Sequence, residues 1–248
     1  MESFITFLNT HLMLGAEQLS TAKDDPTLTF LTEIDSFIFR QINTNPKYEN
    51  VDPTVTKLFI HARNIWIAGI KTVFGGQPYA VTPLLRTSLE SACYATLIHA
   101  DTDLARVWVD RHKDDQSAKN CRKLFTPAVN LVAAELEKKA IGLGQIVTDI
   151  YQNCIDEGAH PNVRGLPGTA KALYGPNGYR KEYVEMNDFY GLQSPKTRAA
   201  ISNTAYVGVL ICYIICLLVD EFGSGPFNEL TKLSDRLDNF DPLTADQG

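Results

Sequence analysis

The run AYVGVLICYIICLLV, residues 205–219, constrains the fold more than any other feature, because it contains no charged residue. A helix that is apolar on every side must be buried on every side, in a protein core or in a bilayer. Crossing a bilayer takes about 20 apolar residues, and this run of 15 ends at Asp220 and Glu221. We therefore expect a central core helix, with no membrane association and with other helices packed around it.

Apolar residues recur at spacings of three and four through the first two thirds of the chain, which is typical of amphipathic helices. The clearest stripe runs from Val55 to Val73, with Asp52 as N-cap, Pro53 in the first turn and two glycines at the end. Further helices are expected at 78–99, 102–111, 117–139 with a bend at Pro127, 145–157 and, as a short C-terminal tail helix, 226–240. The sequence thus predicts an all-α, multi-helix bundle that forms one domain over residues 1–248.

The composition changes after this helical part, with eight Gly or Pro among residues 158–178. This is loop chemistry, and we expect a long Gly/Pro-rich loop inserted at 158–192. Within it, Pro-Asn-Gly between aromatic residues favours a tight turn, so a small β-hairpin is predicted at about 171–184. Loops of this length in a compact domain are usually functional or disordered.

Charge and cysteine content exclude several classes of protein. The formal net charge of −6 gives no general attraction to phosphate backbones, so nucleic acid is not an expected partner. The five cysteines are odd in number and form no C-x-x-C pair, which argues against a disulfide framework or a zinc site. The stretch MESFITFLNTHL has no basic leader, and we expect a cytoplasmic protein without cofactor or metal.

The helix predicted at 145–157 ends in two acids, Asp156 and Glu157. Carboxylates at a helix C-terminus face the negative end of the helix dipole, so this placement calls for a compensating partner. Gly158 is predicted to be a left-handed cap, followed by Pro161.

The partners offered by the next residues are His160, Asn162 and Arg164. Two interpretations remain open. His160 and Asn162 either clamp the loop by hydrogen-bonding its backbone, or they form a binding site together with the two acids and Arg164. A metal site is disfavoured, because no second histidine lies at ligand spacing.

A second candidate constellation is Arg86 with Glu90, the only charges between Gly76 and Ile98. At a spacing of four they share one face of an apolar helix. Burying either charge alone would be costly, so we expect both to be mostly buried. They form either a structural ion pair or one wall of a pocket shared with the loop after Glu157.

Three sequence features together resemble a group of uncharacterised bacterial all-helical proteins. They are the R-x-x-x-E helix at Arg86, the run DTDLARVW from Asp101, and the run YQNCIDEGAHPNVRG from Tyr151 with its H-P-N loop. That group is similar to HEPN-type helical bundles, which include RNA-cleaving toxins and defence proteins as well as inactive, dimerising members. The resemblance implies a HEPN-like, cytosolic, dimeric bundle of bacterial origin in a stress or defence setting, but no particular reaction.

Nuclease members of the HEPN type carry an Arg and a His four to six residues apart. The fit here is Arg106 with His112, in which His112 would be the general base and Arg106 would stabilise phosphate charge. Six residues on a regular helix turn through about 600°, which places the two side chains on different faces. Val107 also departs from the pattern, because a polar residue usually follows the arginine.

The sequence favours a protein that acts by binding rather than by catalysis. The binding residues would be His160, Asn162, Arg164, Asp156, Glu157, Arg86 and Glu90. The partner would be a small ligand or another protein, and a homodimer is expected because apolar helical faces outnumber what one core needs. The alternative is a HEPN-like, metal-independent ribonuclease using Arg106 and His112.

Overall fold

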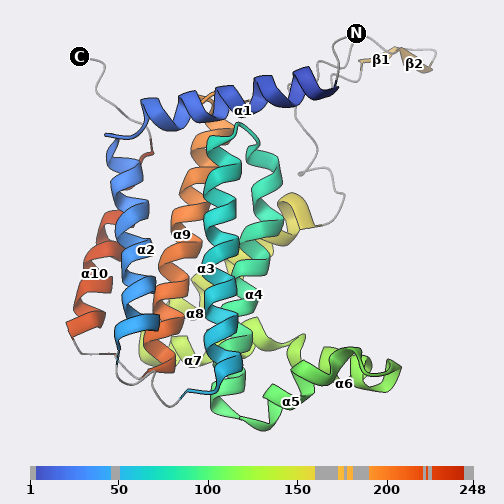
Figure 1. Ribbon diagram of the computed structural model, residues 1–248, viewed down its shortest axis with the longest axis vertical. Coiled ribbons are helices and arrows are strands. Elements are labelled where there is room, and N and C mark those ends of the chain that lie inside the picture. Colours follow the sequence, from blue (N-terminus) through green and yellow to red (C-terminus); the bar gives the residue numbers. More distant parts are fainter. Residues whose placement is uncertain are drawn as a thin grey trace.

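The computed structural model of the protein describes residues 4–45, 51–159, 173–175, 178–180, 190–219, 222 and 225–242 (Figure 1). Over these ranges it is an all-α, multi-helix bundle, which confirms the expected class. The longer helices are α1 (Phe4–Thr21), α2 (Pro26–Thr44), α3 (Pro53–Phe74), α4 (Val81–Ala100) and α9 (Pro195–Leu218). The shorter helices are α5 (Asp103–Val109), α6 (Asp115–Phe125), α7 (Ala128–Lys139), α8 (Leu143–Cys154) and α10 (Gly225–Leu237).

The uncharged run forms most of α9, the core helix of the bundle. Every residue from 207 to 216 is buried, and α9 packs against α2, α3, α4 and α10 (Figure 1). A Cβ atom at Gly208 would stand 2.7 Å from the indole of Trp66, so glycine permits the close approach of α9 and α3. By length and composition α9 is also the one described helix that could cross a bilayer, and 78% of its most apolar window is buried in the bundle.

The predicted boundaries of α3 are confirmed. The Asp52 carboxylate accepts a hydrogen bond from the Thr54 N–H at 2.7 Å, which caps the helix, and Pro53 occupies the first turn. The helix ends at Phe74, and Gly76 takes a positive φ of 76°. Local signals were sufficient here because cap, proline and glycine each act within one turn.

Other boundaries differ from the predictions. The helix expected at 117–139 with a bend is two helices, α6 and α7, because Pro127 lies outside the helical region of φ and ψ and becomes the N-cap of α7. The segment 78–99 begins as a 3₁₀ turn, η2 (Pro78–Ala80), before α4. The segment 102–111 ends as another, η3 (Asp110–His112), after α5. The predicted tail helix at 226–240 is α10.

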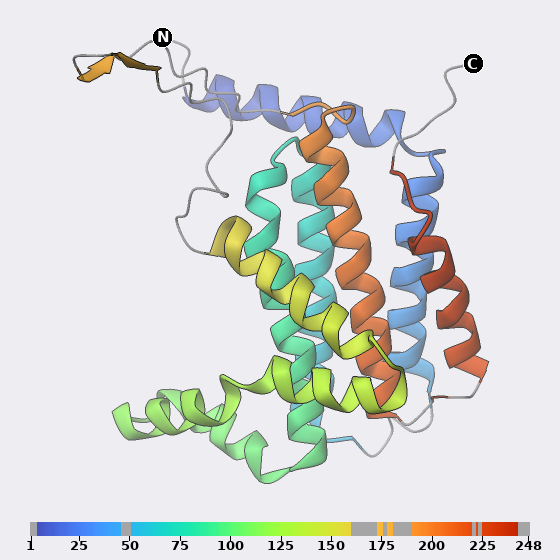
Figure 2. The ribbon, with the colours of Figure 1, turned by 180° about the vertical axis from the view of Figure 1, so that it is seen from behind.

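The remaining helices cover the ends and one side of the bundle. In both views α1 lies across one end of the upright helices (Figures 1 and 2). On the reverse side α8 runs obliquely over α4 and α9, with α7 crossing below it, while α5 and α6 project away from the bundle (Figure 2).

Two short strands are described inside the long segment before α9. These strands, β1 (Leu173–Gly175) and β2 (Gly178–Arg180), pair antiparallel with Tyr174 opposite Tyr179. The rest of 171–184 lies outside the described residues, so the larger hairpin stays a prediction.

Candidate functional site

Three helix ends meet on one side of the bundle. They are the turn η2 before α4, the π-turn η4 (Ile155–Ala159) at the end of α8, and the first turn of α9 at Pro195. The last turns of α8 lie against α4 in Figure 2. Turns of the π type inside helices are frequent at functional sites, and this one falls where the sequence places two adjacent acids.

Gly158 does not cap the helix in the left-handed conformation, so that prediction was wrong. It lies within η4, and among the described glycines only Gly76 and Gly142 have positive φ. A Cβ atom at position 158 would stand 2.1 Å from Thr82 Oγ1 and 3.2 Å from Pro83 Cδ. The chain therefore needs glycine here for close approach to α4, because the widened last turn of α8 presses its backbone onto that helix.

The hydroxyl of Thr82 has no hydrogen-bond partner among the described residues, although the side chain is only 7% exposed. Hydroxyls further along α4 donate to the carbonyl four residues back, as Thr87 does to Pro83 and Ser91 to Thr87. The residue four positions before Thr82 is Pro78, in the 3₁₀ turn η2. Its carbonyl accepts a hydrogen bond from the N–H of Val81. An unpaired buried hydroxyl lowers the free energy of unfolding by about 1–3 kcal/mol. The burial of Thr82 is therefore a cost to the fold that needs an explanation.

A narrow pocket lies beside Thr82, lined by all three helix ends. Its volume is about 90 Å³, several times what one water molecule needs. Apolar wall comes from Leu85 and Ala200, and polar groups come from Asn203. The residues around the pocket are Pro78, Tyr79, Val81, Thr82, Leu85, Glu157, Lys196, Ala199, Ala200 and Asn203.

Two charges of opposite sign stand in this lining, Glu157 and Lys196. In the part of the chain that the structure describes, neither has an ion-pair partner. Lys196 Nζ lies 5.4 Å from the ring centroid of Tyr79, a cation–π distance. Tyr79 itself packs edge-on against Tyr190, with ring centroids 5.3 Å apart.

The dipoles of α9 and α8 add to the electrostatic effect of Lys196 and Glu157. Lys196 is in the first turn of α9, where Ser194 caps the helix and the free N–H groups carry partial positive charge. Glu157 follows α8, at its negative end. The pocket therefore has one wall suited to an anionic group and one wall suited to a cationic or hydrogen-bond-donating group.

Arg86 and Glu90 lie on the same face of α4, further along the helix than Thr82. Arg86 Nε donates to Glu90 Oε1 at 2.9 Å, and the Tyr151 hydroxyl of α8 donates to the same oxygen at 2.6 Å. The arginine and glutamate side chains are 27% and 24% exposed, so both are mostly covered, as expected. Neither lines the pocket beside Thr82, and the hydrogen bond of Tyr151 to Glu90 joins α4 to α8.

Burial and the carboxylate of Glu90 shift the pKa values around this pair. Burial raises the pKa of Tyr151 to about 12, and its hydrogen bond to Glu90 adds to the effect. Burial alone would lower the pKa of Arg86, but the hydrogen bond and charge of Glu90 outweigh it and raise this pKa. At neutral pH the phenol is protonated and the guanidinium charged, which is the state in which both donate to Glu90.

Asp156 and Glu157 have different surroundings although they are adjacent. Asp156 accepts a hydrogen bond from Gln152 Nε2 at 2.9 Å, one turn back along the chain, whereas Glu157 lines the pocket. The predicted partners His160, Asn162 and Arg164 lie outside the described residues, so the pairing of the acids with them stays a prediction.

Buried thiols near this site are not poised for chemistry. Burial, together with the negative charge of Glu157, raises the pKa of Cys154 to about 12. Burial and Glu90 raise the pKa of Cys93 as well. A nucleophilic or metal-binding cysteine needs the thiolate, and these thiols stay protonated at neutral pH. No cluster of three potential metal ligands occurs among the described residues.

The structure does not bring Arg106 and His112 together. The Arg106 side chain is 87% exposed and pairs with Asp110 at 3.6 Å in a hollow between α5 and α6. His112 lines a different hollow, with Tyr94 and Arg122. The separation follows from the chain path, because α5 ends at Val109 and His112 is the last residue of the 3₁₀ turn η3 that follows.

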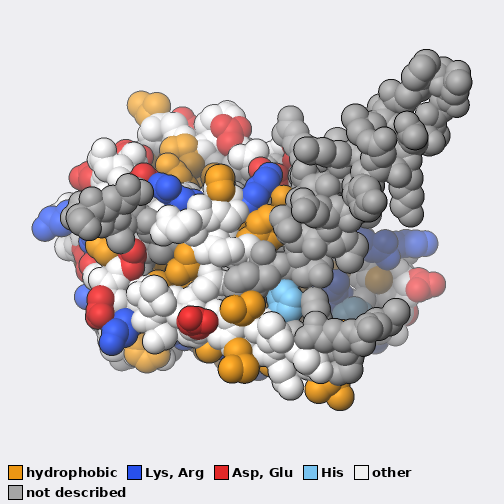
Figure 3. All heavy atoms as spheres, turned by 90° about the horizontal axis from the view of Figure 1, so that it is seen from above, with side chains coloured by type: hydrophobic (Ala, Val, Ile, Leu, Met, Phe, Trp, Pro, Cys, Tyr) orange, Lys and Arg blue, Asp and Glu red, His pale blue; other side chains and the backbone are white. Residues whose placement is uncertain are grey.

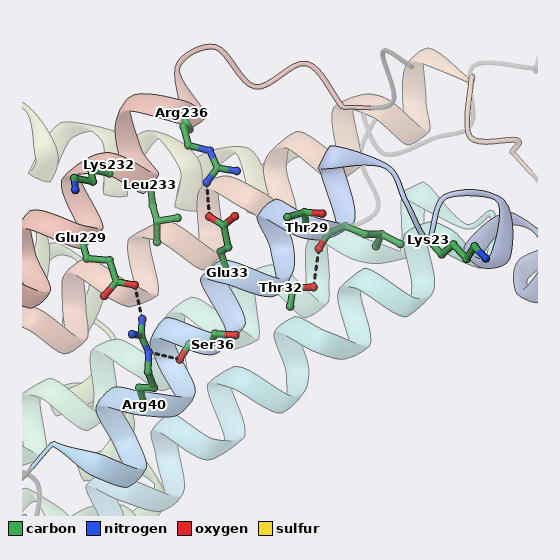
Figure 4. Close-up of a pocket in the computed structure, with 11 residues that line it drawn as sticks. Lys23, Thr29, Thr32, Glu33, Ser36, Arg40, Glu229, Lys232, Leu233 and Arg236 are labelled. Atoms are coloured by element: carbon green, nitrogen blue, oxygen red, sulfur yellow. Dashed lines mark hydrogen bonds and ion pairs between the residues drawn. The ribbon is translucent and has the colours of Figure 1, made fainter. Parts of the chain in front are cut away.

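A larger hollow of about 750 Å³ lies between α2 and α10 (Figure 4). Four of its charged side chains pair with one another, Arg40 with Glu229 and Arg236 with Glu33. The Arg236 guanidinium also lies 4.8 Å from the ring centroid of Phe30. We interpret this groove as the seam that holds α10 to α2, since both ion pairs join these two helices.

The pocket beside Thr82, called the junction pocket below, has four polar lining residues that were not identified from the sequence: Thr82, Tyr79, Lys196 and Asn203. Only Lys196 carries a usable signal, as a cation in the first turn of the most apolar helix, directly after a Ser-Pro cap. The importance of Thr82 depends on η4, which packs against it from 76 residues further along the chain. Comparison of the chain with known protein families, curated proteins and solved structures found no match.

Proposed function

We propose that this protein acts by binding a small polar molecule in the junction pocket between η2, η4 and the start of α9. The observation that carries the proposal is the buried hydroxyl of Thr82, which has no partner among the described residues and lines that pocket. A fold keeps an unsatisfied buried group at a cost, and a bound polar ligand would remove that cost. The stability lost in the empty protein is then recovered on binding.

Glu157 and Lys196, which have no ion-pair partner in the described part of the chain, support the same proposal and suggest the chemistry of the ligand. Lys196 and the start of α9 favour an anionic group, and Glu157 favours an amine or another donor. The small volume limits the part of the ligand that enters to a few non-hydrogen atoms. His160, Asn162 and Arg164 follow Glu157 directly in the chain and are proposed to complete the site.

Binding is preferred to RNA cleavage because Arg106 and His112 line separate hollows. We also propose that the bundle is HEPN-like, which the joining of the R-x-x-x-E helix to α8 through Tyr151 supports. A cytoplasmic location is proposed as well, supported by five cysteines that are all buried and free.

Native mass spectrometry of protein purified from a cytosolic extract tests the proposed function. We expect a population of wild-type protein with additional bound mass, and we expect Lys196→Met to lose it because the variant removes the charge but keeps most of the chain length. Lys232→Met is the matched control, since Lys232 is an exposed lysine in the α2–α10 groove. It should retain the same bound mass as the wild type.

The same three proteins are then screened by thermal unfolding against glycine, acetate and methylamine, which separate the zwitterionic, anionic and cationic requirements. A probe that raises the unfolding temperature of the wild type and of Lys232→Met, but not of Lys196→Met, supports the pocket. If no protein carries bound mass and no probe shifts the unfolding temperature, the proposed function is wrong.

A further inference from the structure

The hollow between α4, η3 and α6 is lined by basic side chains and by no carboxylate. Arg111 and His112 of η3 and Arg122 of α6 line it, and its volume is about 340 Å³. Ligand pockets typically measure roughly 300–1,000 Å³, so a small molecule fits here. The linings of four other hollows around the described residues each include Asp or Glu. We call this space the α6 hollow.

The α6 hollow belongs to the part of the molecule that projects from the bundle, at the end away from α1 (Figures 1 and 2). The end that α1 covers has a different surface, because acidic and basic side chains are interspersed there (Figure 3). A lining with charges of one sign is therefore a local property of the α6 hollow.

The two arginines of the α6 hollow differ from the other arginines of the helices. Eight arginines lie on the described helices. Six of them form an ion pair with a carboxylate: Arg40, Arg63, Arg86, Arg106, Arg198 and Arg236. No ion pair within the described ranges involves Arg111 or Arg122. The two arginines that lack a carboxylate partner thus line the same hollow, where their guanidinium groups are available to an anion.

Helix α6 turns one face towards the hollow. Ala118, Arg122 and Phe125 line the hollow, and their spacing of four and three places them on the same side of the helix. Cys121 and Phe125 are buried, which holds α6 against α4. Phe125 packs edge-on against Tyr94 of α4, with ring centroids 4.9 Å apart. The hollow therefore has an aromatic wall beneath its basic side chains.

Arg111 acts on the same wall from η3. Burial, and for Tyr94 also the charge of Glu90, raises the pKa values of Tyr94 and Cys121. The positive charge of Arg111 opposes the rise in both pKa values. An effect on both groups requires that the guanidinium lies near this wall, so Arg111 and Arg122 stand around one space.

Two guanidinium groups in one hollow suit a phosphate group. A phosphate monoester carries a charge of about −1.5 to −2 at neutral pH, which balances two arginines, whereas a carboxylate balances only one. The planar guanidinium group also binds two phosphate oxygens through parallel hydrogen bonds. His112 adds a ring N–H donor. The rings of Tyr94 and Phe125 offer contact to an apolar part of the molecule that carries the phosphate.

Acidic residues beside the hollow favour a small ligand over nucleic acid. Asp110 precedes Arg111, and Asp114 and Asp115 stand at the start of α6. The Ser117 N–H donates to the Asp114 carboxylate at 2.7 Å and lowers the pKa of this exposed group, so it is charged at neutral pH. A polyanion that extends beyond the hollow meets these carboxylates, whereas a single phosphate group does not.

We propose that the α6 hollow binds a small molecule through a phosphate group, which Arg111 and Arg122 hold and to which His112 donates a further hydrogen bond. The hollow shares no lining residue with the junction pocket, so the proposal holds whether or not that pocket binds a ligand. The site is one of binding and no reaction is assigned to it. Arg106, the partner of His112 in the ribonuclease alternative, lines a separate hollow.

Isothermal titration calorimetry of the full chain, at roughly 0.15 M ionic strength, tests the site with phenyl phosphate as the probe. Arg111→Gln and Arg122→Gln should each weaken binding about tenfold or more, because each removes charge-assisted hydrogen bonds to the phosphate. Lys123→Gln is the matched control, since it removes the same charge from an exposed position next to Arg122 and outside the lining. It should change the affinity less than about twofold. Lys196→Met should bind phenyl phosphate as the wild type does, which separates this site from the junction pocket.

Two further probes distinguish the chemistry of the ligand. Benzoate has the ring of phenyl phosphate but a single charge, and it should bind at least about tenfold more weakly. Inorganic phosphate lacks the ring. If it binds more weakly than phenyl phosphate, the result supports a phosphorylated organic molecule on the aromatic wall; equal binding supports free phosphate in the same site.

A pair of substitutions at Ala118 tests the hollow without removing any of its basic side chains. Ala118 is half-buried in the lining, and Ala118→Glu and Ala118→Gln add side chains of the same size that differ in charge. Phenyl phosphate should bind Ala118→Gln and not Ala118→Glu. Far-ultraviolet circular dichroism checks that both variants keep the wild-type helix content.

The proposal is overturned if phenyl phosphate at about 10 mM does not bind the wild type. Equal affinity for the wild type, Arg111→Gln and Arg122→Gln would also overturn it, as would equal affinity for the two Ala118 variants. A short single-stranded RNA that displaces phenyl phosphate and binds more tightly would overturn the assignment of a small ligand in favour of nucleic acid.

Discussion

Gly158 lies so close to Thr82 that a Cβ atom at position 158 would stand 2.1 Å from the threonine hydroxyl oxygen. This contact holds the π-turn η4 on the first turn of α4 and brings Glu157 into the pocket that Lys196 lines from α9. The contact thus fixes the geometry of the pocket and leaves the Thr82 hydroxyl buried beside it.

Gly158→Ala is expected to lower the free energy of unfolding by about 1–3 kcal/mol, because the added methyl group has no space. Urea denaturation followed by circular dichroism measures the change. Gly225→Ala is the control, since nothing lies within 4 Å of a Cβ atom there. In Gly158→Ala/Thr82→Ala the nearest atom is gone, so the double variant should cost less than the two single changes added. Strict additivity would contradict the contact.

Thr82→Ala should cost less stability than Thr204→Ala by about 1–3 kcal/mol, although both remove the same atoms from a buried threonine. The Thr204 hydroxyl donates to the Ala200 carbonyl at 2.7 Å, whereas the Thr82 hydroxyl has no partner among the described residues. Thr204→Ala loses a hydrogen bond, whereas Thr82→Ala loses an unsatisfied group. Urea denaturation of the two variants without ligand provides the comparison, and equal losses would mean that the Thr82 hydroxyl is paired in solution.

Glu90→Gln is expected to destabilise the fold by about 1–2 kcal/mol, because it removes the charge that Arg86 and Tyr151 both contact in a mostly covered position. Asp110→Asn is the matched control. Its ion pair with Arg106 is also spaced by four residues but is exposed, so its loss should cost no more than about 0.5 kcal/mol. Chemical denaturation distinguishes the two, and a similar cost for both would show that solvent screens Glu90 as well.

Tyr151 should ionise late in an alkaline titration, with a pKa of about 12 in place of 10. Because the folded protein favours the protonated phenol, this group contributes its full stabilisation below pH 10, and the contribution is lost as the pH rises from 10 towards 12. The tyrosinate absorbance of the wild type minus that of Tyr151→Phe isolates this one residue. A difference curve with its midpoint near pH 10 would show that Tyr151 is neither covered nor hydrogen-bonded to Glu90 in the folded state.

The helices of this protein could be predicted well where the signals are local. The cap at Asp52, the proline at 53 and the glycines at 75 and 76 mark α3 correctly, because each acts within a single turn. The same local reasoning failed at Pro127 and at Gly158. A proline can bend a helix or end it, and a glycine can serve as a left-handed cap or permit close packing; the choice depends on what lies against it.

The candidate site was predicted in part. Glu157 was identified from two acids placed against the helix dipole, and the covered pair of Arg86 and Glu90 from their spacing on an apolar helix. Thr82 was missed because nothing in the neighbouring sequence distinguishes it from the other threonines on helices. Its contact with Gly158 comes from a distant part of the chain. Tyr151 was named only as the first residue of the run that carries the resemblance, and its contact with Glu90 could not be predicted because it spans 61 residues.

By itself, the sequence determined the helical class, the central position of the uncharged run and the approximate extent of the longer helices, because apolar spacing and capping are properties of neighbouring residues. The tertiary structure decided which helix ends meet, and therefore which residues form the pocket. It also decided that α1 crosses the end of the bundle, with Gly15 packed against the end of α3. Those outcomes depend on contacts between residues far apart in the chain, where packing space and the pairing of buried polar groups select the arrangement.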